Sequence, residues 1–211
     1  MKLQIALDLV EEEKALNIAE VIAPFVEILE VGTPLLKSAG IKIIHTLKQR
    51  FPSNLILADT KTMDVGELEA KLVFNAGADM MTVCAAAPIE TIQAAIKTAH
   101  NLKKKVIVDF IGIEDKLERA KKIISLNPDY FNIHTAIDVQ VAKGKSFKDL
   151  ALFKENFSIP LSVAGGITPE DIPEIMKYKP SIIVVGGFVT KASDPKKAVM
   201  ILKKEIESVL S

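Results

Sequence analysis

The sequence predicts a (β/α)8 barrel (TIM barrel), built as a single domain over residues 1–211, and three observations support this fold class. Eight short apolar runs recur along the chain, each followed by a stretch with helical spacing of apolar residues. The runs are almost continuous Ile, Val and Leu, as in parallel strands buried on both faces. Reactive residues or glycines follow nearly every run, whereas an open doubly wound sheet, the main alternative, would concentrate them at one switch point.

The eight expected strands come in the order of a barrel, at residues 3–7, 26–29, 55–58, 80–83, 106–108, 130–133, 161–163 and 182–185. The first six are followed by ionisable side chains, namely Asp8, Glu30, Asp59 with Lys61, Cys84, Asp109 and His134. The last two lead into the glycine pairs Gly165-Gly166 and Gly186-Gly187. Because the carboxyl ends of barrel strands form one rim, we expect all these residues to converge there.

The first three units place three carboxylates on this rim. Residues two apart in an extended chain point the same way, so Asp59 and Lys61 are expected to leave the third strand side by side. Asp8 and Glu30 add negative charge that one lysine cannot neutralise, and crowded carboxylates raise each other's pKa unless a cation compensates. The sequence therefore predicts a Mg²⁺ ion at the rim, because oxygen ligands without clustered His or Cys suit Mg²⁺ rather than zinc.

The next three units supply one candidate for proton transfer. His134 ends an apolar run on the rim, where a group that titrates near neutral pH suits general acid/base catalysis. Asp109 faces the same rim, where it either acts in the site or orients its neighbours. Asp138 either caps a helix or supports His134. Cys84 is expected to be a small buried filler, while His45 and His100 are expected to be ordinary surface or packing residues.

The last two units predict a phosphate site. In residues 164–170, two glycines allow close backbone approach, Thr168 suits an N-cap and Pro169 suits the first helical position. Free N–H groups at such a helix start attract a dianion, and Gly186-Gly187 gives a second glycine loop in the position where barrels bind phosphate. We therefore predict that Gly165, Gly166, Gly186 and Gly187 bind a phosphate group. The dinucleotide pattern GxGxxG is absent.

Composition narrows the class of partner and the location. Basic and acidic residues number 27 each, so no global field attracts nucleic acid or anionic lipid. The single cysteine cannot form an internal disulfide, and the sequence shows no signal segment and no membrane-spanning run. These features predict a cytoplasmic protein with a small-molecule ligand, and without a nucleic-acid or membrane partner.

A set of motifs resembles a known family. The motifs occupy residues 6–8, 30–34, 59–66, 134–140, 163–167 and 185–187, and together they resemble the 3-hexulose-6-phosphate synthase family of the orotidine 5'-monophosphate decarboxylase superfamily. The resemblance covers essentially the whole chain. The DxKxxD pattern of Asp59, Lys61 and Asp64 marks the superfamily. The Lys-Thr-Met-Asp form and the Glu-Val-Gly-Thr-Pro segment point to the synthases and to their relatives, the 3-keto-L-gulonate-6-phosphate decarboxylases.

The resemblance implies a lyase of the aldolase type. The implied reaction is a reversible, Mg²⁺-dependent aldol condensation of formaldehyde with D-ribulose 5-phosphate, which gives D-arabino-3-hexulose 6-phosphate through an enediolate. By similarity, Glu30 and Asp59 hold the metal, Lys61 hydrogen-bonds the enediolate oxygens and Asp8 orients Lys61 and the substrate. His134 is the plausible base. Asp64 comes from a second subunit, which implies a homodimer with shared sites.

The chain departs from the family pattern at two places. Ala136 and Ile137 stand where the synthases are expected to carry glycine and an aromatic residue, and Phe188 follows the last glycine pair where some relatives carry an arginine. The decarboxylase alternative typically has an arginine after the histidine, and residues 134–140 contain none, which favours the synthase. A third hypothesis is a barrel that binds a sugar phosphate without turnover. It does not explain why the charged residues Asp8, Glu30, Asp59, Lys61 and His134 occur together.

Overall fold

The computed structural model describes residues 1–139 and 146–210 and shows eight parallel strands that close into a barrel, in the order β1 to β8. The strands are β1 (Lys2–Leu7), β2 (Ile28–Val31), β3 (Leu55–Thr62), β4 (Met80–Cys84), β5 (Lys105–Asp109), β6 (Tyr130–His134), β7 (Leu161–Ala164) and β8 (Ile182–Val185). β8 pairs with β1 and closes the sheet. The predicted (β/α)8 barrel is therefore confirmed.

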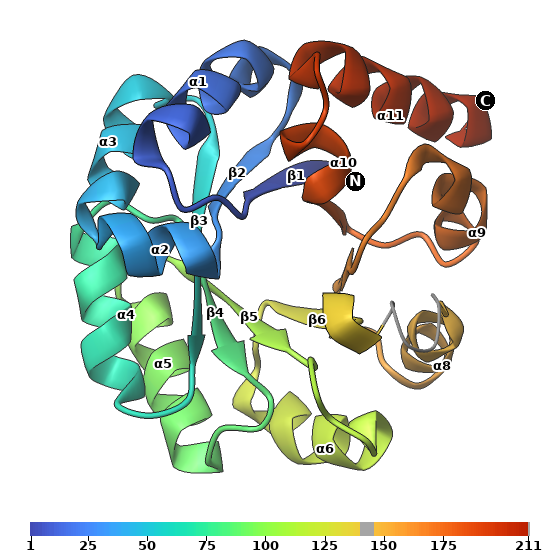
Figure 1. The fold of residues 1–211 in the computed structure, drawn as a ribbon. Helices are drawn as coiled ribbons and strands as arrows, with labels where there is room; N and C mark the ends of the chain where they lie inside the picture. The colour runs from blue at the N-terminus through green and yellow to red at the C-terminus, as the bar shows by residue number, and fades with distance from the viewer. Residues whose placement is uncertain (140–145, 211) are drawn as a thin grey trace.

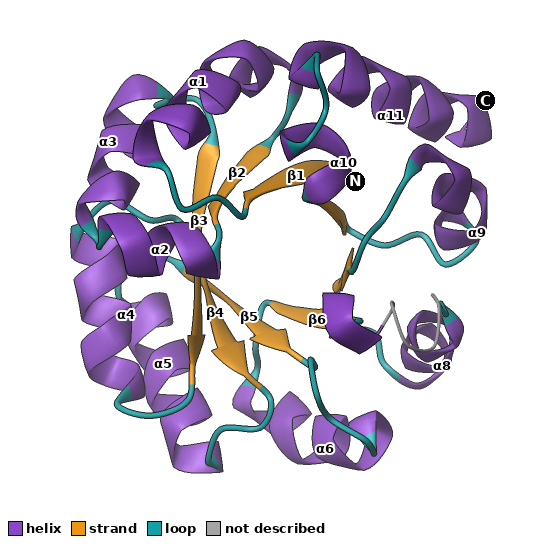
Figure 2. Cartoon of the chain, in the orientation of Figure 1, coloured by secondary structure: helices purple, strands orange, loops and turns teal. Residues whose placement is uncertain are grey.

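Helices surround this sheet as an outer ring (Figures 1 and 2). The helices are α1 (Glu12–Ile22), α2 (Thr33–Ala39), α3 (Lys42–Arg50), α4 (Gly66–Asn75), α5 (Ile89–Asn101), α6 (Lys116–Ile123), α8 (Lys148–Asn156), α9 (Ile172–Met176), α10 (Gly187–Thr190) and α11 (Pro195–Leu210). Short 3-10 turns are η1 (Ala23–Phe25), η2 (Ile124–Leu126) and η3 (Pro169–Asp171). Within the described ranges, we find no helix with the length and apolarity needed to cross a bilayer.

The bounds of β2 and β3 differ most from the prediction, and most other strands extend one residue beyond it. β2 begins at Ile28 instead of residue 26, because the η1 turn around Pro24 uses the chain up to Phe25. β3 continues past residue 58 to Thr62, so that Asp59 lies within the strand. Glu30 also lies inside its strand rather than after it, which brings it deeper into the barrel than the sequence suggested.

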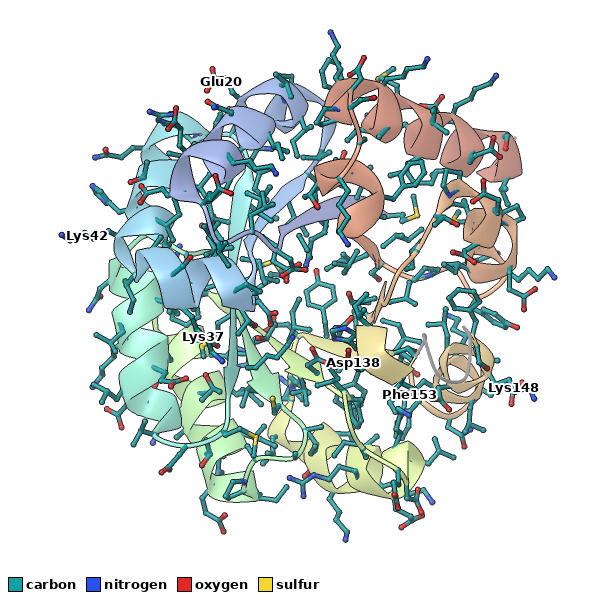
Figure 3. All side chains as sticks on the ribbon, viewed as in Figure 1. Glu20, Lys37, Lys42, Asp138, Lys148 and Phe153 are labelled. Atoms are coloured by element: carbon teal, nitrogen blue, oxygen red, sulfur yellow. The ribbon has the colours of Figure 1, made fainter. Side chains whose placement is uncertain are left out.

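The apolar core has two parts separated by the sheet. The larger part fills the space between strands and helices and includes an aromatic cluster, in which Phe110 lies edge-to-face with Phe131 at 4.9 Å and with Phe153 at 5.0 Å between ring centroids. Such pairs contribute about 0.5–1.5 kcal/mol each beyond area burial. Figure 3 labels Phe153, which α8 brings to this cluster. The smaller part fills the barrel interior.

The barrel interior is layered, and the layers change from apolar to polar toward the carboxyl ends of the strands. Parallel strands in such a barrel are staggered, so inward residues of alternate strands share a level. The register puts Ile28, Met80, Tyr130 and Ile182 lowest, then Gln4, Leu57, Ile107 and Ser162, then Glu30, Thr82, Asn132 and Val184, and then Ala6, Asp59, Asp109 and Ala164. The charged residues therefore stand above an apolar base.

Candidate active site

A cavity of about 650 Å³ opens at the carboxyl-terminal end of the barrel, and residues from all eight strands or the loops after them line it. Nine of the ten predicted site residues line this one cavity, namely Asp8, Glu30, Asp59, Lys61, His134, Gly165, Gly166, Gly186 and Gly187. The tenth, Asp64, lies elsewhere. The prediction that the strand ends converge on one place is confirmed for these nine residues.

Lys61 joins two carboxylates. Its Nζ lies 3.0 and 2.8 Å from Oδ1 and Oδ2 of Asp59, and 3.2 Å from Oδ2 of Asp109. Burial by itself lowers the pKa of a lysine, but here the carboxylates of Asp109 and Asp59 outweigh burial and raise the pKa of Lys61 above its ordinary value. The side chain is therefore a fixed cation, and its ammonium group is held at the cavity wall.

The backbone of β3 is irregular where it carries this lysine. The pairing register with β4 shifts between Ala58 and Thr62, and Lys61 has a φ of 44°. A left-handed conformation at a residue other than glycine costs of order 1–3 kcal/mol, so neighbouring contacts must hold it. Thr82 of β4 supplies them: its Oγ1 accepts a hydrogen bond from the backbone N of Lys61 at 2.9 Å and donates to Oδ1 of Asp59 at 2.7 Å.

Asp59 is held from a second side by the loop after β2. The hydroxyl of Thr33 lies 2.8 Å from both the backbone oxygen and Oδ2 of Asp59. With Thr82 and Lys61 on its other faces, this carboxylate accepts several hydrogen bonds and is only 5 % exposed. Its position is therefore fixed before any ligand arrives.

Glu30 is a buried carboxylate whose hydrogen-bond donor is Gln4. The Nε2 atom of Gln4 lies 2.6 Å from Oε2 of Glu30. Burial raises the pKa of Glu30 well above its ordinary value, the charges of Asp59 and Asp8 raise it further, and the hydrogen bond from Gln4 opposes them. A cation near Glu30 would relieve this repulsion.

Asp8 follows β1 and rests against the backbone of the loop after β2. A Cβ atom at Gly32 would lie 2.1 Å from Oδ1 of Asp8, so only glycine leaves room for this carboxylate. Burial raises the pKa of Asp8, and the charge of Asp59 raises it further, while Lys61 and His134 lower it. Asp8, Glu30 and Asp59 thus share one cavity in which Lys61 only partly offsets their charge, as the sequence predicted.

Asp109 connects the cation to the histidine. Its Oδ2 lies 2.9 Å from Nδ1 of His134, and its Oδ1 accepts a hydrogen bond from the backbone N of Ile111 at 2.9 Å. Burial favours the neutral acid, but the hydrogen bond and charge of His134 and the charge of Lys61 lower the pKa of Asp109 below its ordinary value. An ionised carboxylate only accepts, so Nδ1 of His134 carries the proton and Nε2 is the nitrogen that can take one.

The two glycine loops line the side of the cavity formed by β7 and β8. Gly165 and Gly166 have φ values of 124° and 58°, which side chains rarely tolerate. Thr168 precedes a short turn, as predicted, and its backbone N and hydroxyl lie 2.8 and 3.1 Å from Oδ2 of Asp171. Gly186 comes just before α10. These loops present backbone rather than side chains to a ligand.

Asp64 does not line the cavity of its own chain. It follows β3, is exposed, and accepts a hydrogen bond from the backbone N of Val65 at 2.7 Å. It lies instead in a shallow surface depression with residues of α4 and α5. Asp138 lines the main cavity and is exposed, on the segment after β6 that Figure 3 labels. Gln140, part of the family-like motif, lies outside the described residues.

The remaining polar candidates have structural surroundings. Cys84 is buried, its Sγ lies 3.3 Å from the backbone oxygen of Lys61, and burial together with Asp109 raises the pKa of its thiol to about 11. His45 is exposed on α3, and His100 lies 3.2 Å from Asp129 outside the cavity. All three match their predicted structural roles.

Sequence reasoning undervalued Asp109 and missed Gln4, Thr33 and Thr82. Gln4 could have been identified, because it lies two and four residues before Ala6 and Asp8 on the first strand, and residues at this spacing face the same side. Asp109 also stood at a strand end. Thr33 and Thr82 had no such signal, since threonine is common in strands and at helix starts, and only the register brings their hydroxyls onto Asp59.

Over the residues that the structure describes, no group of three or more His, Cys, Asp and Glu side chains is arranged as a metal site. The cavity nevertheless offers Glu30 and Asp59 on the adjacent strands β2 and β3. Mg²⁺ is commonly bound by one or two carboxylates, with ligand oxygens and water completing its coordination. This pair, with a raised pKa at Glu30, fits such an ion and does not fit a closed protein cage.

Known proteins of similar sequence and structure show what this chain resembles. A curated 3-hexulose-6-phosphate synthase from Mycobacterium gastri is 41% identical over 206 residues, which cover 98% of this chain and 100% of that protein. A crystal structure of a 3-hexulose-6-phosphate synthase superposes with a TM-score of 0.93 at 41% identity, with 98% of this chain and 100% of that chain covered.

A related enzyme has the same architecture. The crystal structure of 3-keto-L-gulonate-6-phosphate decarboxylase from Vibrio cholerae O1 biovar El Tor str. N16961 superposes with a TM-score of 0.89 at 31% identity, covering 99% of this chain and 98% of that chain. The model of the Orotidine 5'-phosphate decarboxylase / HUMPS family matches residues 1–200. The resemblance inferred from the motifs is confirmed, and the chain belongs to the Orotidine 5'-phosphate decarboxylase / HUMPS family.

Proposed function

We propose that the chain is a 3-hexulose-6-phosphate synthase, which condenses formaldehyde with D-ribulose 5-phosphate to D-arabino-3-hexulose 6-phosphate in a reversible aldol reaction. The observation that carries this proposal is the Asp59–Lys61–Asp109–His134 chain of contacts inside the same cavity as the glycine loops. A fixed cation, a proton acceptor and a phosphate-sized cradle together suit the formation of an enediolate from a sugar phosphate.

The cavity has a side lined by glycine loops and a side lined by charged residues, and this difference would orient the substrate. The backbone of Gly165, Gly166, Gly186 and Gly187 would bind the phosphate, because glycine loops at helix starts expose N–H groups. The ketone end would then extend toward Asp59 and Lys61 on the other side. Holding both ends converts the proton abstraction into a step between prepositioned groups.

Two side chains form and stabilise the enediolate. In our proposal, Nε2 of His134 takes a proton from C1 of the substrate, because Asp109 holds the other ring nitrogen protonated. Lys61 then stabilises the enediolate oxygens. Its ammonium is already in place, so no reorganisation accompanies the development of negative charge. Asp8 lies close enough to Lys61 for their charges to interact, and in our proposal it orients the substrate at the edge of the cavity.

A Mg²⁺ ion held by Glu30 and Asp59 forms part of the proposal. When bound, it would polarise the ketone and offset the carboxylates. The donor set supports it, since burial and neighbouring carboxylates raise the pKa of Glu30 well above its ordinary value. EDTA should therefore abolish activity, and added Mg²⁺ should restore it.

We also propose a homodimer in which Asp64 completes the site of the partner. Around Asp64, large apolar side chains are exposed on the surface, namely Met63 (48%), Val65 (52%), Leu68 (55%) and Leu72 (46%). Val65 and Leu68 line a depression of about 480 Å³ together with Asp64. A second copy would cover this apolar surface, which is larger than isolated exposed residues explain. A cytoplasmic location is part of the same proposal, in agreement with the free thiol of Cys84.

The decarboxylase remains the second candidate, because a solved decarboxylase shares the fold at 31% identity. It would release CO₂ from 3-keto-L-gulonate 6-phosphate. The absence of arginine from residues 134–140 argues for the synthase. A barrel that only binds sugar phosphate is the third candidate, and calorimetric binding without product would support it.

One assay tests substrate, reaction and metal together. Purified protein with Mg²⁺ should consume formaldehyde only when ribulose 5-phosphate is present, and not after EDTA. Lys61→Ala should abolish this consumption while circular dichroism shows an intact fold. Absence of formaldehyde consumption by the folded wild type with Mg²⁺ would reject the synthase, and CO₂ release from 3-keto-L-gulonate 6-phosphate would establish the decarboxylase.

A further inference from the structure

Three polar atoms in the barrel interior, below the level of Asp59 and Asp109, are buried without a hydrogen-bond partner in the described structure: Oε1 of Gln4, Oδ1 of Asn132 and Oγ of Ser162. The three residues are 3 %, 7 % and 0 % exposed. They come from β1, β6 and β7, and all three line the same cavity as Lys61 and Glu30. We call these three residues the polar floor of the cavity.

The register places the polar floor on one side of the barrel interior. Gln4 and Ser162 share a level, and Asn132, whose Cα is paired with that of Ser162, stands one level higher. Leu57 and Ile107 occupy the other half of the lower level, and both also line the cavity. The floor is therefore half polar and half apolar, and it lies beneath the level of Asp59 and Asp109.

The described protein supplies no hydrogen-bond partner for these three atoms, so water or a ligand must satisfy them. A buried polar group without a partner costs roughly 1–3 kcal/mol, so three together in one cavity are unusual unless something binds them. Gln4 points its Nε2 at Glu30, which leaves its oxygen as an acceptor, and Oδ1 of Asn132 is an acceptor as well. The hydroxyl of Ser162 can donate or accept. A matching ligand is small and carries two O–H donors.

We propose that the polar floor is the binding site of the one-carbon co-substrate, which enters as the hydrate of formaldehyde. This inference rests on the proposed function and deepens it. In water formaldehyde exists mainly as methanediol, whose two hydroxyls match the two acceptors and whose oxygens accept from Ser162. Its CH₂ group suits the apolar half of the floor, formed by Leu57 and Ile107. A ligand here lies below an enediolate held at Lys61.

The chemistry balances without a further reactant. Methanediol loses one water to give H₂C=O, and that water stays on the floor atoms. The electron pair of the enediolate then forms the bond from C1 to the aldehyde carbon, while the π pair of the C=O bond moves to its oxygen. That oxygen takes up the proton that was removed from C1. The sum is one ribulose 5-phosphate and one formaldehyde joined into one hexulose phosphate.

Ser162→Ala and Asn132→Leu test the proposal. Each removes a buried atom that has no hydrogen-bond partner in the described structure, Oγ of Ser162 or Oδ1 of Asn132, so each should fold, and circular dichroism checks this. Loss of one hydrogen bond should raise the KM for formaldehyde about 3- to 10-fold. The KM for ribulose 5-phosphate should not change. Ser181→Ala is the matched control, because it is the same kind of change just before β8, outside the cavity lining.

A half-reaction separates this inference from the proposed function. The wild type should exchange the C1 proton of ribulose 5-phosphate with D₂O in the absence of formaldehyde, as followed by NMR, and both variants should keep that exchange rate. If neither exchange nor turnover occurs, the proposed function fails. If turnover occurs but both folded variants keep the wild-type KM for formaldehyde, the floor holds water only and the inference is overturned.

Discussion

Nδ1 of His134 lies 2.9 Å from Oδ2 of Asp109, a carboxylate whose side chain is 1 % exposed. The same oxygen lies 3.2 Å from Nζ of Lys61, so one buried atom fixes both the proposed base and the proposed electrophilic cation. Asp109 therefore couples the proposed base, His134, to the proposed cation, Lys61. Removing the charge of Asp109 while keeping the size of its side chain should impair both residues.

Asp109→Asn should lower kcat by about 10²-fold or more, because an amide holds the wrong ring tautomer as readily as the right one and no longer attracts Lys61. The KM for ribulose 5-phosphate should change much less, since in our proposal the phosphate binds at the loops after β7 and β8, whereas Asp109 ends β5. Steady-state kinetics measure both values. The double variant Asp109→Asn with His134→Ala should lose less activity than the two single losses combined, because His134→Ala already removes the part of the Asp109 effect that acts through the histidine, and only the part that acts through Lys61 remains. Fully additive losses would contradict the coupling.

Glu30→Gln should increase stability while it removes activity. Because the folded pKa of Glu30 is raised, ionisation destabilises the fold as pH rises from the ordinary value of 4.5 through the folded pKa. The neutral amide avoids this loss and can still accept from Nε2 of Gln4. At pH 8 in EDTA, the variant should therefore have a higher melting temperature than the wild type. At pH 4 the two proteins should have nearly equal stability.

The metal supplies the control for that comparison. Mg²⁺ at about 100 times its dissociation constant stabilises a folded protein by about 2.7 kcal/mol when only the folded state binds it. Wild-type protein should therefore show a rise in melting temperature with Mg²⁺, and Glu30→Gln should show a much smaller one. Equal shifts in both proteins would mean that Glu30 is not a ligand.

Asp79→Asn should change stability without changing catalysis. Asp79 lies before β4, where its carboxylate accepts from Nζ of Lys48 at 2.8 Å, from Nζ of Lys104 at 2.9 Å and from the backbone N of Ile56 at 3.0 Å. Burial raises its pKa, but these donors prevail and lower it below the ordinary value of 3.8. Its stabilisation is therefore present above that pH and is lost as pH falls through the lower folded pKa.

The size of this effect is limited by solvent, because both lysines are partly exposed. At pH 7, Asp79→Asn should cost about 1 kcal/mol or less, and the difference from the wild type should shrink as pH falls below the ordinary pKa of 3.8. Chemical denaturation at the two pH values measures it. Unchanged kcat/KM is expected, and a loss of activity would show that this end of the barrel is coupled to the cavity.

The sequence predicted the barrel and most of the cavity because both depend on short-range rules. Alternation along each strand and a polar residue at its end were enough to bring Asp8, Asp59 and His134 together, once parallel strands were assumed. It did not predict that β3 would run on to Thr62 with Lys61 at a positive φ, because that conformation depends on hydrogen bonds from a different strand. The polar floor was missed for the same reason: Asn132 and Ser162 become neighbours only through the register.

Two individually inactive variants should restore activity when they share a dimer. In our proposal each site uses Lys61 of one subunit and Asp64 of the other. A mixed dimer of Lys61→Ala and Asp64→Ala subunits therefore contains one site with both changes and one intact site. With random pairing of equal amounts, half of the dimers are mixed, so about one quarter of all sites should be intact. Co-expression with two affinity tags, followed by kinetics on the mixed dimer, measures this.

The matched control pairs Lys61→Ala with Glu30→Gln. Both changes lie in the cavity of their own chain, so every site of the mixed dimer is damaged and no activity should return. This contrast isolates Asp64, because it is the one predicted site residue that the described chain leaves outside its own cavity. If Lys61→Ala with Asp64→Ala also stays inactive while forming dimers, Asp64 does not act across the interface. Its exposed position beside Met63, Val65 and Leu68 would then reflect a contact surface alone.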